Sequence, residues 1–202
     1  MIYPKVFNDL IECFKKFPGI GEKTAERLAF AILSLDEKEV KEFSDSLINS
    51  KEKLVPCKNC GTLTDKDYCI ICSDKSRDKE ELIVVEDSKE VFLFEKIGNF
   101  RGYYHVLGGL ISPLDDIGPD DIRIKELVKR IDENEITEVI LAIKSSLEAD
   151  TTSLYINKIL EDKNVKVTRI ASGIPIGADM DYVDALTLES ALNNRMQIGD
   201  KL

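Results

Sequence analysis

Histidine is nearly absent from this chain of 202 residues, which contains only His105. A catalytic pair of a serine or cysteine with a histidine base would therefore depend on this one ring. His105 lies inside the apolar run 102–107, where a buried, hydrogen-bonded ring is the expected outcome. No Gly-x-x-x-x-Gly-Lys-Ser/Thr phosphate loop is present either. Histidine-based hydrolases and P-loop nucleotide enzymes are thus disfavoured.

Long hydrophobic runs are also missing, since none approaches the roughly 20 residues of a membrane-spanning helix. The N-terminus is polar too early for a secretory signal peptide, so we expect a cytoplasmic protein without membrane association. The net charge of −10 argues against a broad basic surface for nucleic acid. Any contact with nucleic acid must then be a local site, or must combine several subunits.

Cysteine is scarce, yet four of the five cysteines fall in one short stretch. Cys57, Cys60, Cys69 and Cys72 form two Cys-x-x-Cys pairs with eight residues between them. Four thiolates predict one closed, tetrahedral Zn²⁺ site, with Zn–S distances near about 2.3 Å and no position left for water. Such a zinc ion holds structure and does no chemistry. The alternative is a pair of disulfides, which requires an oxidising compartment. For the fifth residue, Cys13, we expect a buried structural thiol.

Two glycines mark a turn near the N-terminus. Apolar residues at helical spacing predict a helix over 5–16, and a second helix follows the segment Gly19-Ile20-Gly21. The glycines permit positive φ and allow backbone N–H groups at a helix start to approach an anion. Lys23 and Arg27 are one turn apart and fall on one outward face of the second helix.

This pattern resembles the helix-hairpin-helix motif, Pro-Gly-Ile-Gly-x-x-x-Ala, which holds a DNA phosphate without reading bases. The DNA-binding residues that it implies are Gly19, Gly21, Lys23, Thr24 and Arg27. The alternative is a helical hairpin that makes only protein contacts. A third helix is predicted after a capping box of Asp36 and Glu39. Its inner face is expected to consist of Val40, Phe43, Leu47 and Ile48.

The second half of the chain follows a different pattern, in which short apolar runs alternate with helical stretches after a charged linker at 73–81. Strands are predicted at 82–86, 102–107, 139–143 and 165–170. Helices are predicted at 87–97, 122–131, 151–160 and 183–192. This alternation predicts an α/β domain with a mostly parallel sheet and helices on both faces.

Three carboxylates are expected near the carboxyl ends of these strands, where sites gather in open α/β sheets. Glu86 ends the first strand, and Glu148 and Asp150 follow the third. Together they could hold Mg²⁺ for phosphoryl transfer. We prefer the alternative, in which Glu86 terminates a strand and the other two begin a helix, where the helix dipole favours acidic residues.

The order of these parts resembles the RecR family of bacterial recombination mediators nearly from end to end. The most specific stretches are Leu28-Ala29-Phe30, the cysteine spacing, and the runs 104–114, 118–122 and 173–177. The resemblance implies a Toprim α/β domain and a homo-oligomeric, tetrameric ring. It also implies a DNA-binding protein without enzymatic activity that binds single- and double-stranded DNA and helps RecO or RecF to load RecA onto SSB-coated single strands.

The resemblance also divides the chain and suggests a partner site. The four parts are a helix-hairpin-helix region at 1–54, a zinc motif at 55–78, a Toprim-like domain at 79–175, and a C-terminal helix and tail at 176–202. The acidic residues expected to meet a protein partner are Glu86, Glu148 and Asp150.

One segment departs from the family pattern. Relatives tend to carry Ala-Thr-Asn-Pro and then Glu-Gly-Glu, whereas residues 142–150 read Ala-Ile-Lys-Ser-Ser-Leu-Glu-Ala-Asp. Catalytic Toprim enzymes have aspartates at the positions of Lys144 and Ser146, and a charged lysine repels Mg²⁺. Ser172 stands where relatives usually have histidine. Two other interpretations stay open: a Toprim metal-dependent nuclease or topoisomerase, and a zinc-stabilised protein-interaction scaffold.

Overall fold

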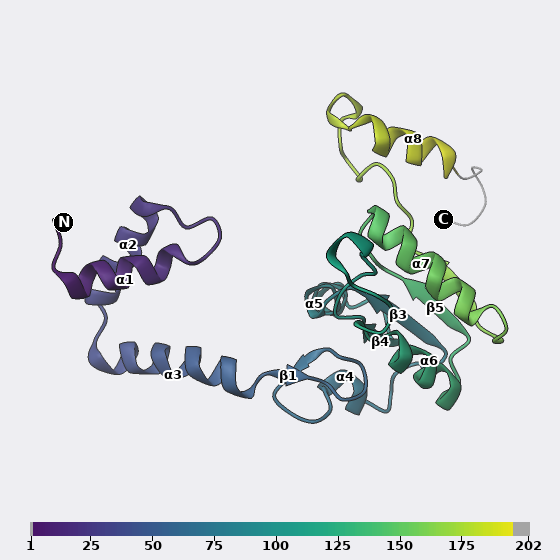
Figure 1. Ribbon diagram of the computed structural model, residues 1–202, viewed down its shortest axis with the longest axis horizontal. Helices are drawn as coiled ribbons and strands as arrows, with labels where there is room; N and C mark the ends of the chain where they lie inside the picture. Colours follow the sequence, from purple (N-terminus) through teal and green to yellow (C-terminus); the bar gives the residue numbers. More distant parts are fainter. Residues whose placement is uncertain (1, 196–202) are drawn as a thin grey trace. The chain divides into compact units, whose positions relative to one another are not determined.

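The computed structural model describes residues 2–195 and divides the chain into two compact units, 1–54 and 55–202 (Figure 1). Residues 196–202, the last part of the predicted C-terminal tail, lie outside the described residues. Within residues 2–195, no helix is both long and apolar enough to cross a membrane.

The first unit contains three helices, α1 (Lys5–Lys15), α2 (Glu22–Leu33) and α3 (Glu37–Lys53). Its core forms where α1 meets α2, around the buried residues Ile11, Ala25 and Ala29. The two alanines lie one turn apart on α2, and their small side chains allow α1 to approach closely. The sequence predicted both helices correctly.

Two expectations about this unit are wrong. Cys13 is exposed, because it lies two residues beyond Ile11 and therefore points away from the buried face of α1. The apolar stripe of α3 is also uncovered: Phe43, Leu47 and Ile48 are 47%, 51% and 53% exposed. The predicted capping box of Asp36 and Glu39 does form, but α3 has no buried residue, since α1 and α2 pack on each other.

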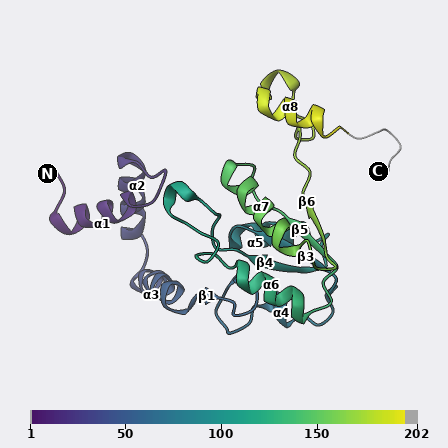
Figure 2. The same cartoon turned by 45° about the vertical axis from the view of Figure 1, so that its right-hand side comes forward.

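The second unit is built on a four-stranded sheet in which all strands are parallel, in the order β4-β3-β5-β6 (Figure 2). The strands are β3 (Glu81–Val85), β4 (Tyr103–Val106), β5 (Glu138–Leu141) and β6 (Lys166–Arg169). The main helices are α5 (Ser88–Ile97), α6 (Ile124–Glu133), α7 (Leu147–Leu160) and α8 (Ala185–Asn193). Short 3-10 turns lie at Pro113–Asp115 and Met180–Tyr182. The predicted α/β class is confirmed.

Each face of the sheet has its own hydrophobic core. Leu82 and Val84 of β3 point to the face covered by α6 and α7, where they join Leu127 and Ile156. The intervening residues Ile83 and Val85 point to the opposite face, which α5 covers. This alternation follows from the period-two geometry of a strand and confirms helices on both faces.

The four-cysteine motif covers part of the α5 face. It consists of a ribbon of β1 (Val55–Pro56) and β2 (Leu63–Thr64), which pair antiparallel, and the short helix α4 (Ile70–Ser73). Cys57, Cys60, Cys69 and Ile71 belong to the same buried cluster as β3 and β4. The motif is therefore built into the second unit.

Helix α7 begins four residues earlier than the sequence predicted. The Ser146 hydroxyl accepts a hydrogen bond from the backbone N–H of Ala149 at 3.2 Å, which makes Ser146 the N-cap. Glu148 and Asp150 consequently lie in the first helical turn, as the preferred interpretation of these two residues required.

Candidate metal centre and nucleic-acid interface

The four cysteines meet at one point. Their sulfur atoms all lie within 4.8 Å of one another, and those of Cys60 and Cys69 are 3.5 Å apart. A tetrahedron with Zn–S bonds of about 2.3 Å has sulfur–sulfur edges of about 3.8 Å, so the cluster fits a zinc ion. All five cysteines of the chain are free, and the alternative of two disulfides is therefore wrong.

A tight turn aims the first two sulfurs at this point. The Gly61 N–H donates to the Cys57 carbonyl at 2.9 Å, and the Cys57 N–H donates to the Thr62 carbonyl at 2.8 Å. Gly61 has φ of +80°, in the left-handed region that favours glycine. A Cβ at this position would lie 2.9 Å from Nε of Arg123 and 3.0 Å from the Val106 carbonyl, so no larger residue fits without a shift.

Backbone N–H groups surround the sulfur atoms. The N–H groups of Cys69, Thr62 and Cys72 donate to the sulfurs of Cys57, Cys60 and Cys69 at 3.3, 3.4 and 3.4 Å. Hydrogen bonds to a charged group favour that form of the group. The hydrogen bond with Cys60 lowers the pKa of the Cys69 thiol, whereas the pKa of the Cys72 thiol is raised, chiefly by its own contact with Cys60. The backbone N–H donors at Cys57, Cys60 and Cys69 favour the thiolate form, which is the form of cysteine that binds a metal ion.

The motif is also hydrogen-bonded to the sheet. The Val106 N–H of β4 donates to the Cys60 carbonyl at 2.7 Å, and the Leu63 N–H donates to the Ser88 hydroxyl at 2.9 Å. These bonds fix the first cysteine pair against β4 and the start of α5.

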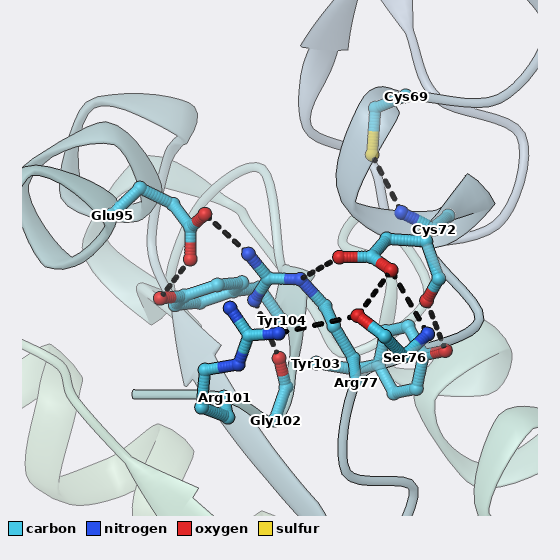
Figure 3. A network of polar contacts seen from close by, with 10 residues as sticks. Cys69, Cys72, Ser76, Arg77, Glu95, Arg101, Gly102, Tyr103 and Tyr104 are labelled. Atoms are coloured by element: carbon cyan, nitrogen blue, oxygen red, sulfur yellow. Dashed lines mark hydrogen bonds and ion pairs between the residues drawn. The ribbon is translucent and has the colours of Figure 1, made fainter. Parts of the chain in front are cut away.

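The segment after the last cysteine is held by the polar network of Figure 3. Arg77 donates to the Gly102 carbonyl at 2.9 Å and pairs with Glu95, whose other oxygen accepts from the Tyr104 hydroxyl at 2.8 Å. The side chain of Arg77 is only 7% exposed. The predicted charged linker is thus a fixed connection between the cysteine motif and the sheet.

The glycine turn of the first unit has the backbone that the sequence predicted. Gly19 has φ of +80°, and Gly21 is the N-cap of α2 with φ of −86° and ψ of 175°. No side chain of the described residues caps this helix, so its first N–H groups are available to an external acceptor. A helix start of this kind favours an anion through its dipole.

Two cations lie beside this uncapped helix start. Lys23 and Arg27 are both exposed on α2, and neither forms an ion pair within the part of the chain that the structure describes. Thr24 is half-buried between them. Lys15, in contrast, pairs with Glu12 and Glu22 at 2.7 Å each. Lys23 and Arg27 therefore keep their charge for an external partner.

The three carboxylates of the sheet edge have separate partners. Glu86 pairs with Lys144 at 3.0 Å, and Asp150 pairs with Arg169 at 2.6 Å. The pKa of Glu148 lies below its usual value, chiefly because of its hydrogen bond with Ser146. Among residues 2–195, the four cysteines are the only group of three or more His, Cys, Asp or Glu side chains that lie close enough to share a metal ion. Glu86, Glu148 and Asp150 thus do not converge on one ion.

His105 is completely buried, as predicted. Its Nε2 lies 2.7 Å from the carbonyl oxygen of Arg123, and burial lowers its pKa to about 4. The ring is therefore neutral at physiological pH and holds the segment before α6 against β4.

Arg130 is a residue that sequence reasoning did not single out. It is buried on α6, on the same face as Leu127 and Ile131. Its burial could have been predicted from the sequence, because Arg130 lies three residues after Leu127. This spacing puts a charge on the inner face of an amphipathic helix.

The fold and these sites define a class of protein, one that joins a helix-hairpin-helix region to a Toprim domain. Residues 80–171 match the family model of the Toprim domain. Residues 7–51 match the model of the RecR helix-hairpin-helix, and residues 173–196 match that of the RecR C-terminal region.

Comparison with full-length relatives points to the same family. The chain is 46% identical to recombination protein RecR of Streptococcus thermophilus over 198 residues, which are 98% of this chain and 100% of the relative. The proteins of the same name from Streptococcus uberis and Streptococcus equi subsp. equi are 46% and 47% identical over the same shares. The chain belongs to the RecR family.

Proposed function

We propose that this protein is a non-enzymatic mediator of recombinational DNA repair that binds the DNA backbone through its helix-hairpin-helix. Membership of the RecR family supports the role in recombination and repair. Binding is independent of sequence, because the groups on offer reach phosphates rather than base edges. Single- and double-stranded DNA are therefore both ligands.

The observation that carries this proposal is the uncapped start of α2 beside two cations that have no ion pair among residues 2–195. Backbone N–H groups at Gly21 and beyond can donate to a phosphate oxygen, while Lys23 and Arg27 supply charge. One hairpin offers few contacts, and the net charge of −10 opposes the approach of DNA. A single subunit should therefore bind weakly, and several subunits on one strand should bind much more tightly.

The test is a double substitution, Lys23→Ala with Arg27→Ala, assayed by fluorescence anisotropy on labelled single-stranded DNA across a salt series. Each subunit that contacts DNA loses two phosphate contacts, so the slope of log K against log salt should fall by about 1.4 per engaged subunit. The matched control is Lys51→Ala with Lys53→Ala, which removes the same charge from the end of α3.

The two double variants together distinguish the possible functions. A loss of DNA affinity that is confined to the Lys23→Ala, Arg27→Ala variant supports the DNA-binding site. Equal losses in both would show a general charge effect, and no loss in the Lys23→Ala, Arg27→Ala variant would make the protein-interaction scaffold the leading function.

We also propose one structural Zn²⁺ per chain, held by Cys57, Cys60, Cys69 and Cys72. Support comes from the four converging sulfur atoms and from the N–H groups that donate to them. Four sulfur ligands complete a tetrahedron, so the ion would stabilise the fold and leave no position for a substrate or water.

The absence of catalysis is part of the same proposal. In this chain Lys144 occupies a position where catalytic Toprim enzymes have a metal-binding aspartate, and its ammonium group lies 3.0 Å from Glu86. This internal cation takes the place beside Glu86 that a metal ion would need. The alternative of a metal-dependent nuclease or topoisomerase lacks the required acidic pair.

The remaining proposals concern partners and organisation. We propose that the protein works in the cytoplasm with RecO or RecF to load RecA onto SSB-coated DNA, with Glu86, Glu148 and Asp150 as the partner surface. A tetrameric ring is proposed as the assembly, and the half-exposed stripe of α3 supports contact between copies. The proposed domain organisation consists of four parts, at 1–54, 55–78, 79–175 and 176–202.

A further inference from the structure

Arg130 of α6 is a buried charge that has no acidic partner in the described part of the chain. Its exposure is 6%, and its Nη1 donates to the Tyr104 carbonyl at 2.5 Å. Its guanidinium carbon lies 5.5 Å from the centre of the Tyr103 ring. Among the described residues, the arginines that form ion pairs are Arg77, Arg123 and Arg169. A buried guanidinium without a countercharge is costly, so a source of negative charge is needed nearby.

The cysteine cluster lies beside Arg130. Arg130 and Cys72 line the same cavity of about 160 Å³, together with Asn59, Lys79 and Asn134. The Asn59 amide donates to the sulfur of Cys72 at 3.5 Å. Negative charge on this sulfur would therefore face a buried cation across a small polar space.

A second arginine lies at the other cysteine pair. Nε of Arg123 is 2.9 Å from the position that a Cβ on Gly61 would occupy, directly after Cys60. Within residues 2–195, Nε and Nη2 of Arg123 are buried and have no hydrogen-bond partner. Its acidic neighbour Glu126 is 3.8 Å from Nη1, at the long end of ion-pair distances. The charge of Arg123 is thus largely uncompensated on the side that faces the cysteine turn.

We propose that Arg130 and Arg123 are the countercharges of the metal centre, one at each Cys-x-x-Cys pair, and that they hold zinc by balancing its thiolates. This inference rests on the proposed zinc site. Four thiolates and one Zn²⁺ carry a net charge of −2, and two guanidinium groups supply +2. Both arginines belong to the segment around α6. The sheet domain therefore contributes to the affinity of a metal whose four ligands all come from another segment.

The experiment measures zinc affinity in the full-length protein by competition with a chromophoric chelator. Three substitutions at position 130 separate charge from hydrogen bonding and packing. Arg130→Met removes the charge and the donor, Arg130→Gln removes the charge but keeps an N–H donor on a shorter side chain, and Arg130→Lys keeps the charge. Loss of a group that supports metal ligands typically costs about 10–100-fold in affinity. We expect that loss for the Met and Gln variants, and affinity within about threefold of the parent for the Lys variant.

Two further variants complete the design. Arg123→Gln should also weaken zinc binding, and its partly exposed side chain makes the substitution less disruptive to folding. Arg169→Gln removes the same charge at β6, the opposite edge of the sheet from β4, and should leave zinc affinity unchanged. Circular dichroism of each variant establishes that the fold is retained.

The possible results are distinguishable. Zinc-free parent protein would overturn the zinc proposal itself. Zinc-loaded parent with parental affinity in Arg130→Gln and Arg123→Gln would overturn the countercharge inference alone. An equal loss in the Gln and Lys variants of Arg130 would also overturn it, because shape rather than charge would then determine affinity.

Discussion

Gly19 and Gly21 flank one isoleucine but have different backbone requirements. Gly19 has φ of +80°, a region that costs an L-residue roughly 1–2 kcal/mol, whereas Gly21 has φ of −86°. Gly19→Ala should therefore lower the free energy of unfolding of the first unit by about that amount. Gly21→Ala should keep stability close to the parent but weaken DNA binding, because its Cβ would stand where a phosphate approaches. Denaturant unfolding and DNA anisotropy on both variants measure the two effects; parental DNA affinity in Gly21→Ala would contradict the proposed contact.

His105 predicts a pH dependence of stability. Its folded pKa is about 4 against the ordinary 6.5, so the folded protein disfavours the protonated ring. Its contribution to stability is complete above pH 6.5 and is lost as pH falls from 6.5 through 4, by up to about 3 kcal/mol. His105→Gln should lack this component, which the difference in denaturation midpoints across the pH series would measure. Parallel curves for parent and variant would contradict it.

Residue patterns predicted which side chains lie close together but not which partners compensate the buried charges. The spacing of the cysteines correctly predicted that their four sulfur atoms converge, because the two Cys-x-x-Cys turns are local structures. The burial of Arg77 and Arg130 depends on Glu95 and on the backbone of β4, which lie 18 and 26 residues away in sequence. No local pattern contains such a pairing.

At the scale of elements, the cysteine motif should fold only with its metal. Cys57→Ser or prolonged chelation should destabilise the second unit at the upper end of single-substitution effects, about 4 kcal/mol or more, because Cys57 lies in the core shared with β3 and β4. Metal analysis should find one zinc per chain in parent protein purified without chelators. Normal thermal stability of the metal-free protein would contradict this prediction.

The edge of the sheet gives a second prediction at this scale. With Lys144 paired to Glu86, Mg²⁺ should support no DNA nicking, relaxation or ATP hydrolysis. The measurement is a supercoiled-plasmid assay over a range of Mg²⁺ concentrations, with Glu86→Gln as control. Nicking that is reproducible in the parent and vanishes in Glu86→Gln would overturn it.

Helix starts show which element boundaries were predictable. The capping box of Asp36 was recognised from sequence, since Asp36 pairs with a glutamate three residues later. The cap of α7 was missed, because Ser146 has no such partner and a neighbouring serine competes for the role. The order of the strands in the sheet could not be predicted either, because β3 pairs with β5 through contacts between residues far apart in sequence, which no local pattern encodes.

At the scale of the whole molecule, the exposed stripe of α3 predicts association. The native mass should be about four times the chain mass of 22.8 kDa, as measured by light scattering with and without DNA. Leu47→Glu places a charge in the middle of this stripe and should reduce the mass. The matched control Glu42→Gln lies on the same helix and should not. A monomeric parent would contradict the ring.

The shared core of the cysteines and β4 has a consequence for synthesis of the chain. Residue 106 leaves the ribosome 34 residues after Cys72, an interval of roughly 2–7 s at about 5–20 residues/s. During this interval the four cysteine thiols of the nascent chain lie close together, but β4, the strand that will help to bury them, has not yet emerged. Early capture of a metal ion would keep them from cross-linking to one another. With the proposed zinc site, we therefore expect the yield of native protein to depend more on zinc supplied during translation than on zinc supplied afterwards.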